Sequence, residues 1–410
     1  MTTYSSYLHK KLEQIPFDLF DILSDYIELR KNIKIAFVGG YLRDLLINKI
    51  HSNCSYFPVD LDIIVEGSAI DLALYIKRNI SNVSLCLIKE YEIYKTVELN
   101  IDNFKVDIAS ARTEEYLSPG LNPNVYDSTI IEDLARRDFT INSIAYEINR
   151  RKLIDIFDGI NHIKMKELHL LHQNSISDDP SRILRCAKYA SRFRFKISKS
   201  SLIQAQKTID KWPWHAISKK SLPPGISIRM RMELSEILKY DNISTIVSEL
   251  YRWGLISIIN KEINVNNKFL RGLNWIKRIK GKVILYLIKD SESLELLCQR
   301  FFINKKERKI LDDYRNIRNI LDSNRKDFLN FKPSNWTEFI ESNNLHIETA
   351  KLIISDGSNF WKPFFRWLFL YRFIKSNKNG EELKNEGWIQ GEEIGTEIKR
   401  LRYMEIDKKS

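Results

Sequence analysis

Two periodicities of hydrophobic and polar residues divide the chain. Between residues 34 and 112, apolar residues form short runs or alternate with polar ones, which is typical of strands. These segments are KIAFVGG, VDLDIIVEG, SLCLIKEY, KTVELNI and FKVDIASAR. Helical patterns flank them at residues 6–31, at YLRDLLINK and at SAIDLALYIKRNI, where Ser68 is a predicted N-cap. Strands and helices mixed in one segment predict an α/β or α+β domain.

The pattern changes after residue 132, where strand signals nearly vanish and only KLIDIFDG is strand-like. From Asp178 onward the spacing is helical, as in SRILRCAKYASRFRF, IRMRMELSEILKY, TIVSELYRWGLI, ESLELLCQRFF and KKERKILDDYRNIRNIL. The segment EEYLSPGLNPNVYDST is rich in Pro, Gly and Asn and predicts a mobile loop. No fixed-period repeat is present, so a helical solenoid is not expected. The sequence predicts a mixed first domain followed by a long helical remainder.

An aromatic segment, FWKPFFRWLFLYRF at residues 360–373, has two interpretations. Aromatic side chains at this density usually pack in a core. The alternative is an exposed docking surface in a helical scaffold.

Composition adds a preference for an anionic partner. Charged residues make up 29% of the chain, the formal net charge is +12 and the pI is about 9.2. This excess favours nucleic acid or an acidic membrane surface, although many basic proteins bind no polyanion. The four cysteines are far apart, which fits a reducing compartment and predicts neither a zinc site nor a disulfide framework. No signal pattern or membrane span is present in the sequence, so a cytoplasmic protein without membrane contact is expected.

The strand VDLDIIVEG contains two carboxylates, Asp60 and Asp62. Residues i and i+2 of a strand project from the same face, so these two side chains point the same way. A cation between them would relieve their repulsion, and Mg²⁺ typically binds one or two carboxylates together with phosphate oxygens. The alternative is an ordinary solvent-facing strand face.

The preceding GGYLRD strengthens the metal interpretation. Gly39 and Gly40 let backbone amides approach an anion closely, and the helix that follows offers its positive end to phosphate. Arg43, one turn into that helix, can add a charge-assisted bond to phosphate oxygens. The order of turn, helix and carboxylate strand predicts a site for a nucleoside triphosphate and its metal.

Two further segments carry candidate residues. Asp107 lies among apolar residues in FKVDIASAR, where either a metal or a salt bridge to a nearby arginine would stabilise its charge. In EDLARRDFTINSIAYEI, Arg136 and Arg137 have side chains that suit triphosphate oxygens. Asp138 can orient an arginine or cap the next helix, and a surface ion pair is the alternative for all three.

The segment SDDPSRILRCAKYASRFRFKISK predicts a helix that starts at Ser177–Pro180. Four cationic residues lie within about 120° on the helical wheel: Arg182, Arg185, Lys188 and Arg192. Seven basic residues and no acidic residue occur between Arg182 and Lys199. A face without acidic partners predicts an anion-facing surface, and a solvated face is the alternative.

Several motifs occur in a fixed order: GGYLRD, DLD, DIASARTEEY, RRDFTINS, FDG and DDPSRILR. In this order they resemble those of class II tRNA nucleotidyltransferases and their close relatives, the bacterial poly(A) polymerases. IRMRMELSEIL (228–238) is similar to the family's body-domain motif, and GEEIGTEIKRLRYMEID (391–407) to its common C-terminal ending. The matches are dense over residues 35–240 and sparse beyond.

The resemblance implies an α+β fold, with a polymerase-β-like nucleotidyltransferase head that contains a mixed sheet. Mainly α-helical parts would follow it. The implied boundaries are a head at 1–145, a base-recognising neck at 146–215, and a tRNA-binding body and tail at 216–330 and 331–410.

The family's site residues carry over by position. Asp60 and Asp62 would bind two Mg²⁺ ions, and Asp107 is a third catalytic candidate. The implied nucleotide-binding residues are Gly39, Gly40, Arg43, Arg136, Arg137, Asp138, Asp179, Arg182 and Arg185. Asp179 and Arg182 would read the incoming base. Cytosine and adenine both place an exocyclic NH₂ beside an unprotonated ring nitrogen, so a carboxylate and a guanidinium suit both bases.

The implied activity is template-independent addition of C and A to tRNA 3′ ends from CTP and ATP, with release of pyrophosphate. The alternatives are an enzyme that adds only A, a poly(A) polymerase, or a tRNA-binding protein that has lost catalysis. Asp178 and Ser143 depart from the family's usual Glu and Ala. Arg112, Thr113 and Glu114 resemble an element missing from relatives that add only CC, which favours full CCA addition.

Overall fold

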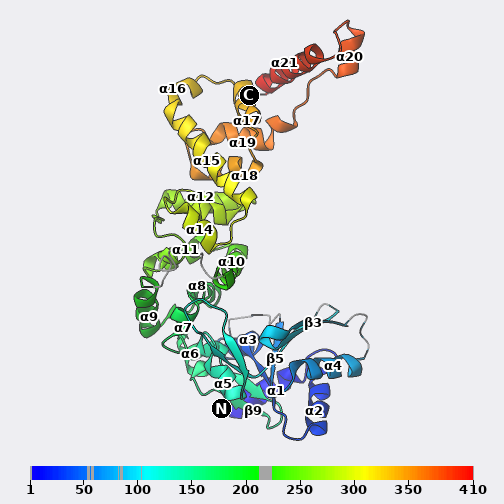
Figure 1. Ribbon diagram of the computed structural model, residues 1–410, viewed down its shortest axis with the longest axis vertical. Helices are drawn as coiled ribbons and strands as arrows, with labels where there is room; N and C mark the ends of the chain where they lie inside the picture. The colour runs from blue at the N-terminus through cyan, green and yellow to red at the C-terminus, as the bar shows by residue number, and fades with distance from the viewer. Residues whose placement is uncertain are drawn as a thin grey trace. The chain divides into compact units, whose positions relative to one another are not determined.

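The chain forms two compact units, Met1–Arg229 and Met230–Ser410 (Figure 1). The computed structural model describes residues 2–52, 56, 60–81, 83, 86–102, 104–211 and 224–409. Cys54 and the predicted boundary between neck and body at 215/216 lie outside these residues. The division into four parts stays a prediction.

A seven-stranded sheet forms the centre of the first unit, in the order β3-β4-β5-β2-β1-β8-β9. The strands are β1 (Ile35–Val38), β2 (Asp60–Val65), β3 (Cys86–Tyr91), β4 (Thr96–Ile101), β5 (Phe104–Ser110), β8 (Ala145–Glu147) and β9 (Lys152–Ile154). All neighbours are antiparallel except β2 and β5, which run parallel. The predicted mixed sheet and α+β class are confirmed.

The helices of this unit are α1 (Thr2–Leu12), α2 (Leu19–Leu29), α3 (Gly39–Ile50), α4 (Ala69–Asn79), α5 (Ile130–Ala135), α6 (Gly159–Met165), α7 (Ser175–Asp178), α8 (Arg182–Phe193) and α9 (Lys199–Ile209). Two 3₁₀ turns, η1 (Glu92–Tyr94) and η2 (Thr140–Asn142), lie between them. Helix α3 packs on β1 and β2, and α4 packs on β4 and β5. The predicted N-cap is confirmed, because the Ser68 side chain accepts a hydrogen bond from the Asp71 N–H.

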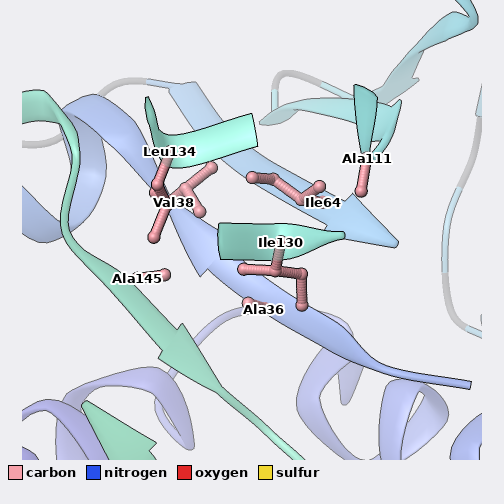
Figure 2. Packing of buried hydrophobic residues seen from close by; sticks show 7 residues of the cluster. All are labelled: Ala36, Val38, Ile64, Ala111, Ile130, Leu134 and Ala145. Atoms are coloured by element: carbon pink, nitrogen blue, oxygen red, sulfur yellow. The ribbon is translucent and has the colours of Figure 1, made fainter. Parts of the chain in front are cut away.

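One face of the central strands is covered by α5. Figure 2 shows Val38 of β1 and Ile64 of β2 in one cluster with Ile130 and Leu134 of α5. Directly paired residues of adjacent strands project from the same side, and Val38 is paired with Asp62. Asp62 therefore lies at the end of this apolar patch, on the face that α5 covers.

A capping box fixes the start of α5. The Thr129 side chain accepts from the Glu132 N–H, and the Glu132 carboxylate accepts from the Thr129 N–H. These bonds satisfy amides that the first turn of a helix leaves unpaired. The cap positions the arginines that follow the helix.

Three sequence predictions of local structure are wrong. The predicted loop at 114–129 contains a hairpin, in which β6 (Arg112–Glu115) pairs with β7 (Asn124–Asp127). Strands continue beyond residue 132, because β8 and the short parallel pair β10 (Glu167–Leu168) and β11 (Lys196–Ile197) follow. The helix predicted from Ser177 is interrupted: Ser177 and Asp178 end α7, and α8 begins at Arg182.

The second unit is helical in its described residues, as predicted. Its elements are α10 (Pro224–Lys239, which begins in the first unit), α11 (Ile243–Arg252), η3 (Ile256–Ile258), α12 (Asn267–Arg278), α13 (Val283–Ile288), α14 (Leu294–Arg300), α15 (Lys305–Ser323), α16 (Arg325–Phe328), α17 (Pro333–Ser342), α18 (Ile347–Asp356), α19 (Trp361–Phe369), η4 (Tyr371–Phe373), α20 (Gly380–Asn385) and α21 (Glu392–Lys408). None of the helices in the described ranges combines the length and apolar composition that crossing a bilayer requires.

The aromatic segment at 360–373 divides between core and surface. Phe364, Trp367 and Tyr371 are buried, which confirms the core interpretation for one face. Phe369 and Phe373 on the other side are 50% and 63% exposed. The segment therefore has apolar side chains on both faces.

Candidate active site

The Gly39–Gly40 pair lies directly against Asp62. The Gly40 N–H donates to Asp62 Oδ2 at 3.3 Å. Gly39 has a φ of +74°, and a Cβ atom on it would lie 2.3 Å from the same oxygen. Only glycine satisfies both the backbone conformation and the close approach. The sequence predicted a glycine turn near the carboxylates, and in the structure these residues begin α3 without an intervening turn.

Asp62 and Asp107 are directly paired on the parallel strands β2 and β5. Burial raises the pKa of Asp62; Arg137 lowers it, whereas the Asp107 charge raises it further. Burial also raises the pKa of Asp107. Asp60, at the exposed start of β2, shares this face of the strand. The three predicted carboxylates are therefore brought to one face of the sheet.

We call Asp60, Asp62 and Asp107 the carboxylate cluster. Two residues that the sequence did not single out, Lys105 and Glu98, lie beside it. Lys105 Nζ lies 2.9 Å from Asp107 Oδ2 and 3.2 Å from Glu98 Oε2. The partner of Asp107 is thus a lysine two residues away, where the sequence suggested an arginine. A cleft of about 370 Å³ opens beside these groups, and its lining includes Asp62, Asp107 and Arg137.

Arg136 and Arg137 share one buried carboxylate. Asp133 Oδ1 lies 2.6 Å from Arg136 Nη2, and its Oδ2 lies 3.1 Å from Arg137 Nη2. Arg136 also bonds Glu114 Oε1 at 2.6 Å, which links α5 to the β6–β7 hairpin. Burial would raise the pKa of Asp133, but the two arginines outweigh it and lower the pKa. Both arginines are oriented by ion pairs, and Arg137 lines the cleft.

The carboxylates suit a divalent cation that also binds phosphate. In the described part of the chain, no group of three or more His, Cys, Asp or Glu residues is arranged to hold a metal by itself. Mg²⁺ usually takes one or two carboxylates plus substrate phosphates and water. The Asp107 charge raises the pKa of Asp62, and a cation bound between the two carboxylates offsets this repulsion. The residues present therefore fit Mg²⁺ bound together with a phosphate ligand.

Arg43 is buried in an ion-pair network at the start of α3. It lies 2.7 Å from Asp44 Oδ1 and donates to Asn142 Oδ1 at 2.7 Å. Its guanidinium lies 4.9 Å from the Tyr189 ring centroid and 4.8 Å from that of Phe193, both on α8. Its donors are engaged within the protein in this structure. Its contact with phosphate stays a prediction.

Asp138 connects the RRDFTIN segment to α8. Its carboxylate accepts from Asn142 Nδ2 at 2.9 Å and from Arg185 Nη1 at 2.9 Å. Burial would raise the pKa of Asp138, but Arg185 and the bond from Asn142 outweigh it and lower the pKa to about 2. Of the two roles the sequence suggested, orienting an arginine is the one these contacts match.

Asp179 and Arg182 lie at the junction of α7 and α8, and both are buried. Asp179 accepts from the Ser181 N–H and hydroxyl and lies 3.1 Å from Arg229 Nε. Arg182 donates to Ser175 Oγ at 2.8 Å and contacts His172 Nε2 at 3.2 Å. Burial, followed by the Arg182 charge, lowers the pKa of His172 to about 4, so a neutral imidazole accepts from Arg182.

The cationic face predicted for α8 is partly neutralised. Arg185 pairs with Asp138, and Arg192 lies 2.6 Å from Asp44 Oδ2. These acidic partners come from elsewhere in the chain, so the helix's own sequence did not reveal them. Arg182 is buried, whereas the sequence placed it on an exposed face.

Sequence reasoning did not identify a second set of residues around Asp179. Arg229, at the end of the first unit, donates to the Gly120 carbonyl at 3.0 Å and to Asn122 Oδ1 at 3.0 Å. It therefore joins the loop between β6 and β7 to Asp179. A body-domain motif was recognised at this position, but the motif alone does not indicate its contacts.

Comparison with known proteins places the head-domain part of this site in a family. Residues 35–169 match the family described as the Poly A polymerase head domain. An A-adding tRNA nucleotidyltransferase of Aquifex aeolicus is 32% identical over 272 residues, covering 65% of this chain and 30% of the relative. A CC-adding tRNA nucleotidyltransferase of Deinococcus radiodurans is 30% identical over 178 residues, covering 42% of this chain and 44% of the relative. The chain thus spans less than half of the length of these relatives.

Solved structures share the fold over nearly the whole chain. An apo CCA-adding enzyme has a TM-score of 0.75 at 24% identity, covering 97% of this chain and 93% of the other. Structures described as CCA-adding enzymes with ATP, with tRNA and with CTP have TM-scores of 0.71, 0.70 and 0.70. At this identity the likeness establishes the fold. Residues 35–169 therefore belong to the family described as the Poly A polymerase head domain.

Proposed function

We propose that the chain adds C and A nucleotides to tRNA 3′ ends without a nucleic-acid template and releases pyrophosphate. The observation that carries this proposal is the pairing of Asp62 with Asp107 on adjacent parallel strands, with Asp62 against the Gly40 amide. Carboxylates provide ligands for a metal, and the helix start beside them provides a backbone amide for phosphate. The cytoplasm, where tRNA is processed, is the proposed compartment.

The reaction is an in-line substitution at the α-phosphorus of CTP or ATP. The oxygen of the RNA 3′-hydroxyl forms a new bond to that phosphorus, and the bond to the bridging oxygen of the leaving pyrophosphate breaks. The hydroxyl proton passes to water or to a site carboxylate. Asp60 and Asp62 are the proposed ligands of two Mg²⁺ ions, with Asp107 as a third carboxylate. When bound, Mg²⁺ supplies charge neutralisation of the triphosphate and lowers the pKa of the attacking hydroxyl.

The chain's own residues position the triphosphate. Arg137 lines the cleft beside Asp62, and its bond to Asp133 fixes the orientation of the guanidinium. Helix α3 directs its N-terminal amides to the same place, where the helix dipole favours anions. Gly40 and Arg137 are therefore the proposed phosphate contacts, with Arg136 and Arg43 acting through the ion pairs around them.

Asp179 and Arg182 are proposed to select the base. Cytosine and adenine offer an amino donor and a ring-nitrogen acceptor, which a carboxylate and a guanidinium satisfy. Uracil and guanine present the opposite polarity, and each buried unpaired polar group costs roughly 1–3 kcal/mol. The buried setting of both side chains makes such mismatches costly.

A second candidate function is addition of A alone. It is favoured by the first three relatives, which are all A-adding tRNA nucleotidyltransferases. The arginine and glutamate of the β6–β7 hairpin instead favour full CCA addition, as the family resemblance implied. Poly(A) synthesis is a third outcome of the same chemistry.

One assay separates these functions. Purified protein, Mg²⁺ and labelled CTP or ATP are incubated with three tRNA transcripts that end before CCA, after C and after CC. Incorporation of both nucleotides in order supports CCA addition, incorporation on the third transcript alone indicates A addition, and homopolymer tails on any RNA indicate poly(A) synthesis. Absence of incorporation on all three rejects the proposal.

A substitution of Asp60 tests whether this carboxylate takes part in the reaction. We expect Asp60→Ala to abolish turnover while tRNA affinity stays within about twofold, because the exposed Asp60 lies apart from the buried core. Retained turnover would remove Asp60 from the metal site. Asp25→Ala, an exposed carboxylate on α2, is the matched control and should leave turnover unchanged.

A further inference from the structure

Four aromatic side chains form a continuous row on the second unit. We call Trp275 of α12 and Trp361, Phe365 and Phe369 of α19 the aromatic row. The centroid of the Trp275 ring lies 6.5 Å from Trp361 and 6.3 Å from Phe365. Along α19, Phe365 lies 6.0 Å from Trp361 and 4.8 Å from Phe369. Residues four apart share one face of a helix, so the three α19 rings form one stripe.

The aromatic row is not required to fill the core. The opposite face of α19 supplies Phe364, Trp367 and Leu368 to the interior, and all three are buried. Trp275 is 39% exposed and Phe369 is 50% exposed. Leu370 and Phe373, which follow the helix in sequence, are 41% and 63% exposed. Contiguous exposed apolar surface of this kind marks an interaction site.

The charge around the aromatic row indicates the kind of partner. Neither α12 nor α19 contains an acidic residue. Both helices carry exposed cations, which are Lys268, Arg271, Arg278, Lys362 and Arg366. The Arg278 guanidinium lies 5.6 Å from the Trp275 ring centroid. Rings on helices that carry cations and no acidic residue complement a ligand that combines flat π-faces with negative charge, which is the chemistry of unpaired nucleotides.

We propose that the aromatic row is a stacking surface for unpaired bases of RNA, with phosphates held by the neighbouring cations. The surface belongs to the second unit, whereas the carboxylate cluster belongs to the first. The two sites are therefore built from different residues and different units of the chain. The inference rests on the proposed function only for the identity of the RNA as tRNA. An apolar protein partner is the competing occupant, and the lack of acidic residues on α12 and α19 argues for the polyanion.

The test replaces rings by an aliphatic side chain of similar hydrophobicity. The double variant Trp275→Leu/Phe369→Leu keeps an apolar surface but removes two exposed π-faces. Binding of a labelled tRNA transcript and of a labelled single-stranded 12-mer is measured without nucleoside triphosphate. Base–aromatic stacking is worth roughly 1–3 kcal/mol per base, so Kd should rise about tenfold or more for both RNAs. Tyr251→Leu, at a 45% exposed tyrosine of α11, is the matched control and should leave Kd unchanged.

Salt dependence separates stacking from charge. The leucine variant should weaken binding at every salt concentration without changing the slope of log Kd against log salt. Arg366→Gln should instead reduce that slope by about one. A changed slope for the leucine variant, or an unchanged Kd, overturns the proposal. Loss of self-association in sedimentation with unchanged RNA affinity also overturns it and assigns the row to protein docking.

The two proposals fail separately. If the chain adds no nucleotide to any tRNA transcript but the leucine variant still loses RNA affinity, the stacking surface stands and the proposed reaction is wrong. If nucleotides are added and the leucine variant binds RNA as the unchanged chain does, the proposed reaction stands and the stacking surface is wrong. Circular dichroism and thermal unfolding verify that both variants are folded.

Discussion

Gly39 is the residue whose identity the site constrains most. Its φ of +74° is unfavourable for any other residue, and a Cβ would lie 2.3 Å from Asp62 Oδ2. We expect Gly39→Ala to lower the free energy of unfolding by about 1–3 kcal/mol and to reduce turnover at least about 100-fold. Denaturant unfolding and nucleotide incorporation measure the two effects.

Gly67→Ala is the control for this prediction. Its Cβ would lie 3.2 Å from the end of the Ile33 side chain, and its φ is not in the left-handed region. Stability should fall slightly and turnover should be retained. Equal losses of turnover in the two variants would show that the effect of Gly39→Ala is not specific to Asp62.

The His172 imidazole provides a pH prediction. Its pKa is lowered to about 4 in the folded chain, below the ordinary value of 6.5. Between pH 6.5 and 4 the unfolded state binds the extra proton, so stability falls as the pH falls through this range. We expect His172→Gln to flatten this part of the stability profile, measured by denaturant unfolding at several pH values. An unchanged profile would mean that His172 is protonated at the same pH in both states.

At the scale of single residues, the sequence predicted the acidic site better than the arginines. Asp60 and Asp62 share a strand face because side chains alternate along every strand. The contacts of Arg43 depend on Asn142 and Tyr189, which other elements supply. Such partners follow from tertiary packing, so the local pattern around Arg43 does not contain them.

Helix α5 is the element that connects the core to the site. It packs Ile130 and Leu134 on the sheet. It also carries Asp133, which forms ion pairs with Arg136 and Arg137. We expect Thr129→Ala, which removes the cap, to lower the free energy of unfolding by about 1 kcal/mol and to reduce turnover several-fold. Unfolding and steady-state kinetics measured on one preparation test both effects.

Ser68→Ala in α4 removes a cap of the same kind. It should cost similar stability with turnover unchanged, because α4 carries none of the proposed phosphate contacts. A fall in turnover equal to that of Thr129→Ala would mean that any loss of stability in this unit impairs the reaction.

At the scale of elements, hydrophobic runs predicted the main strands and helices, whereas polar strands were missed. The sequences RTEE and NVYD of β6 and β7 contain little apolar alternation, so they read as loop. Their pairing comes from backbone hydrogen bonds and from Arg136, which bonds Glu114. The break between α7 and α8 was not predicted either, because SDDPSR carries the usual signals of a single helix start.

Net charge is a property of the whole molecule, and it predicts how RNA affinity depends on salt. The chain carries a formal charge of +12. Binding that releases counterions from RNA weakens as salt rises, so Kd for tRNA should increase about tenfold or more between 50 and 200 mM NaCl. Fluorescence anisotropy with a labelled transcript measures this. An affinity independent of salt would contradict phosphate contacts as the main source of binding.

For the whole molecule, motif order predicted the fold, and the division of the chain was harder to predict. The motifs anticipated a mixed head and helical remainder because each spans a short local segment. The change of unit at Arg229 lies inside helix α10 and has no composition signal. A continuous helical pattern does not reveal which of its turns pack with which core.

The bond between the Gly40 amide and Asp62 has a consequence for how an anion enters the site. The amide already donates to a carboxylate oxygen, so a phosphate that binds there as proposed would replace Asp62 as the acceptor. Exchanging one acceptor for another contributes little net affinity. Under the proposed function, binding of phosphate to this amide would therefore be coupled to release of the Asp62 carboxylate from it.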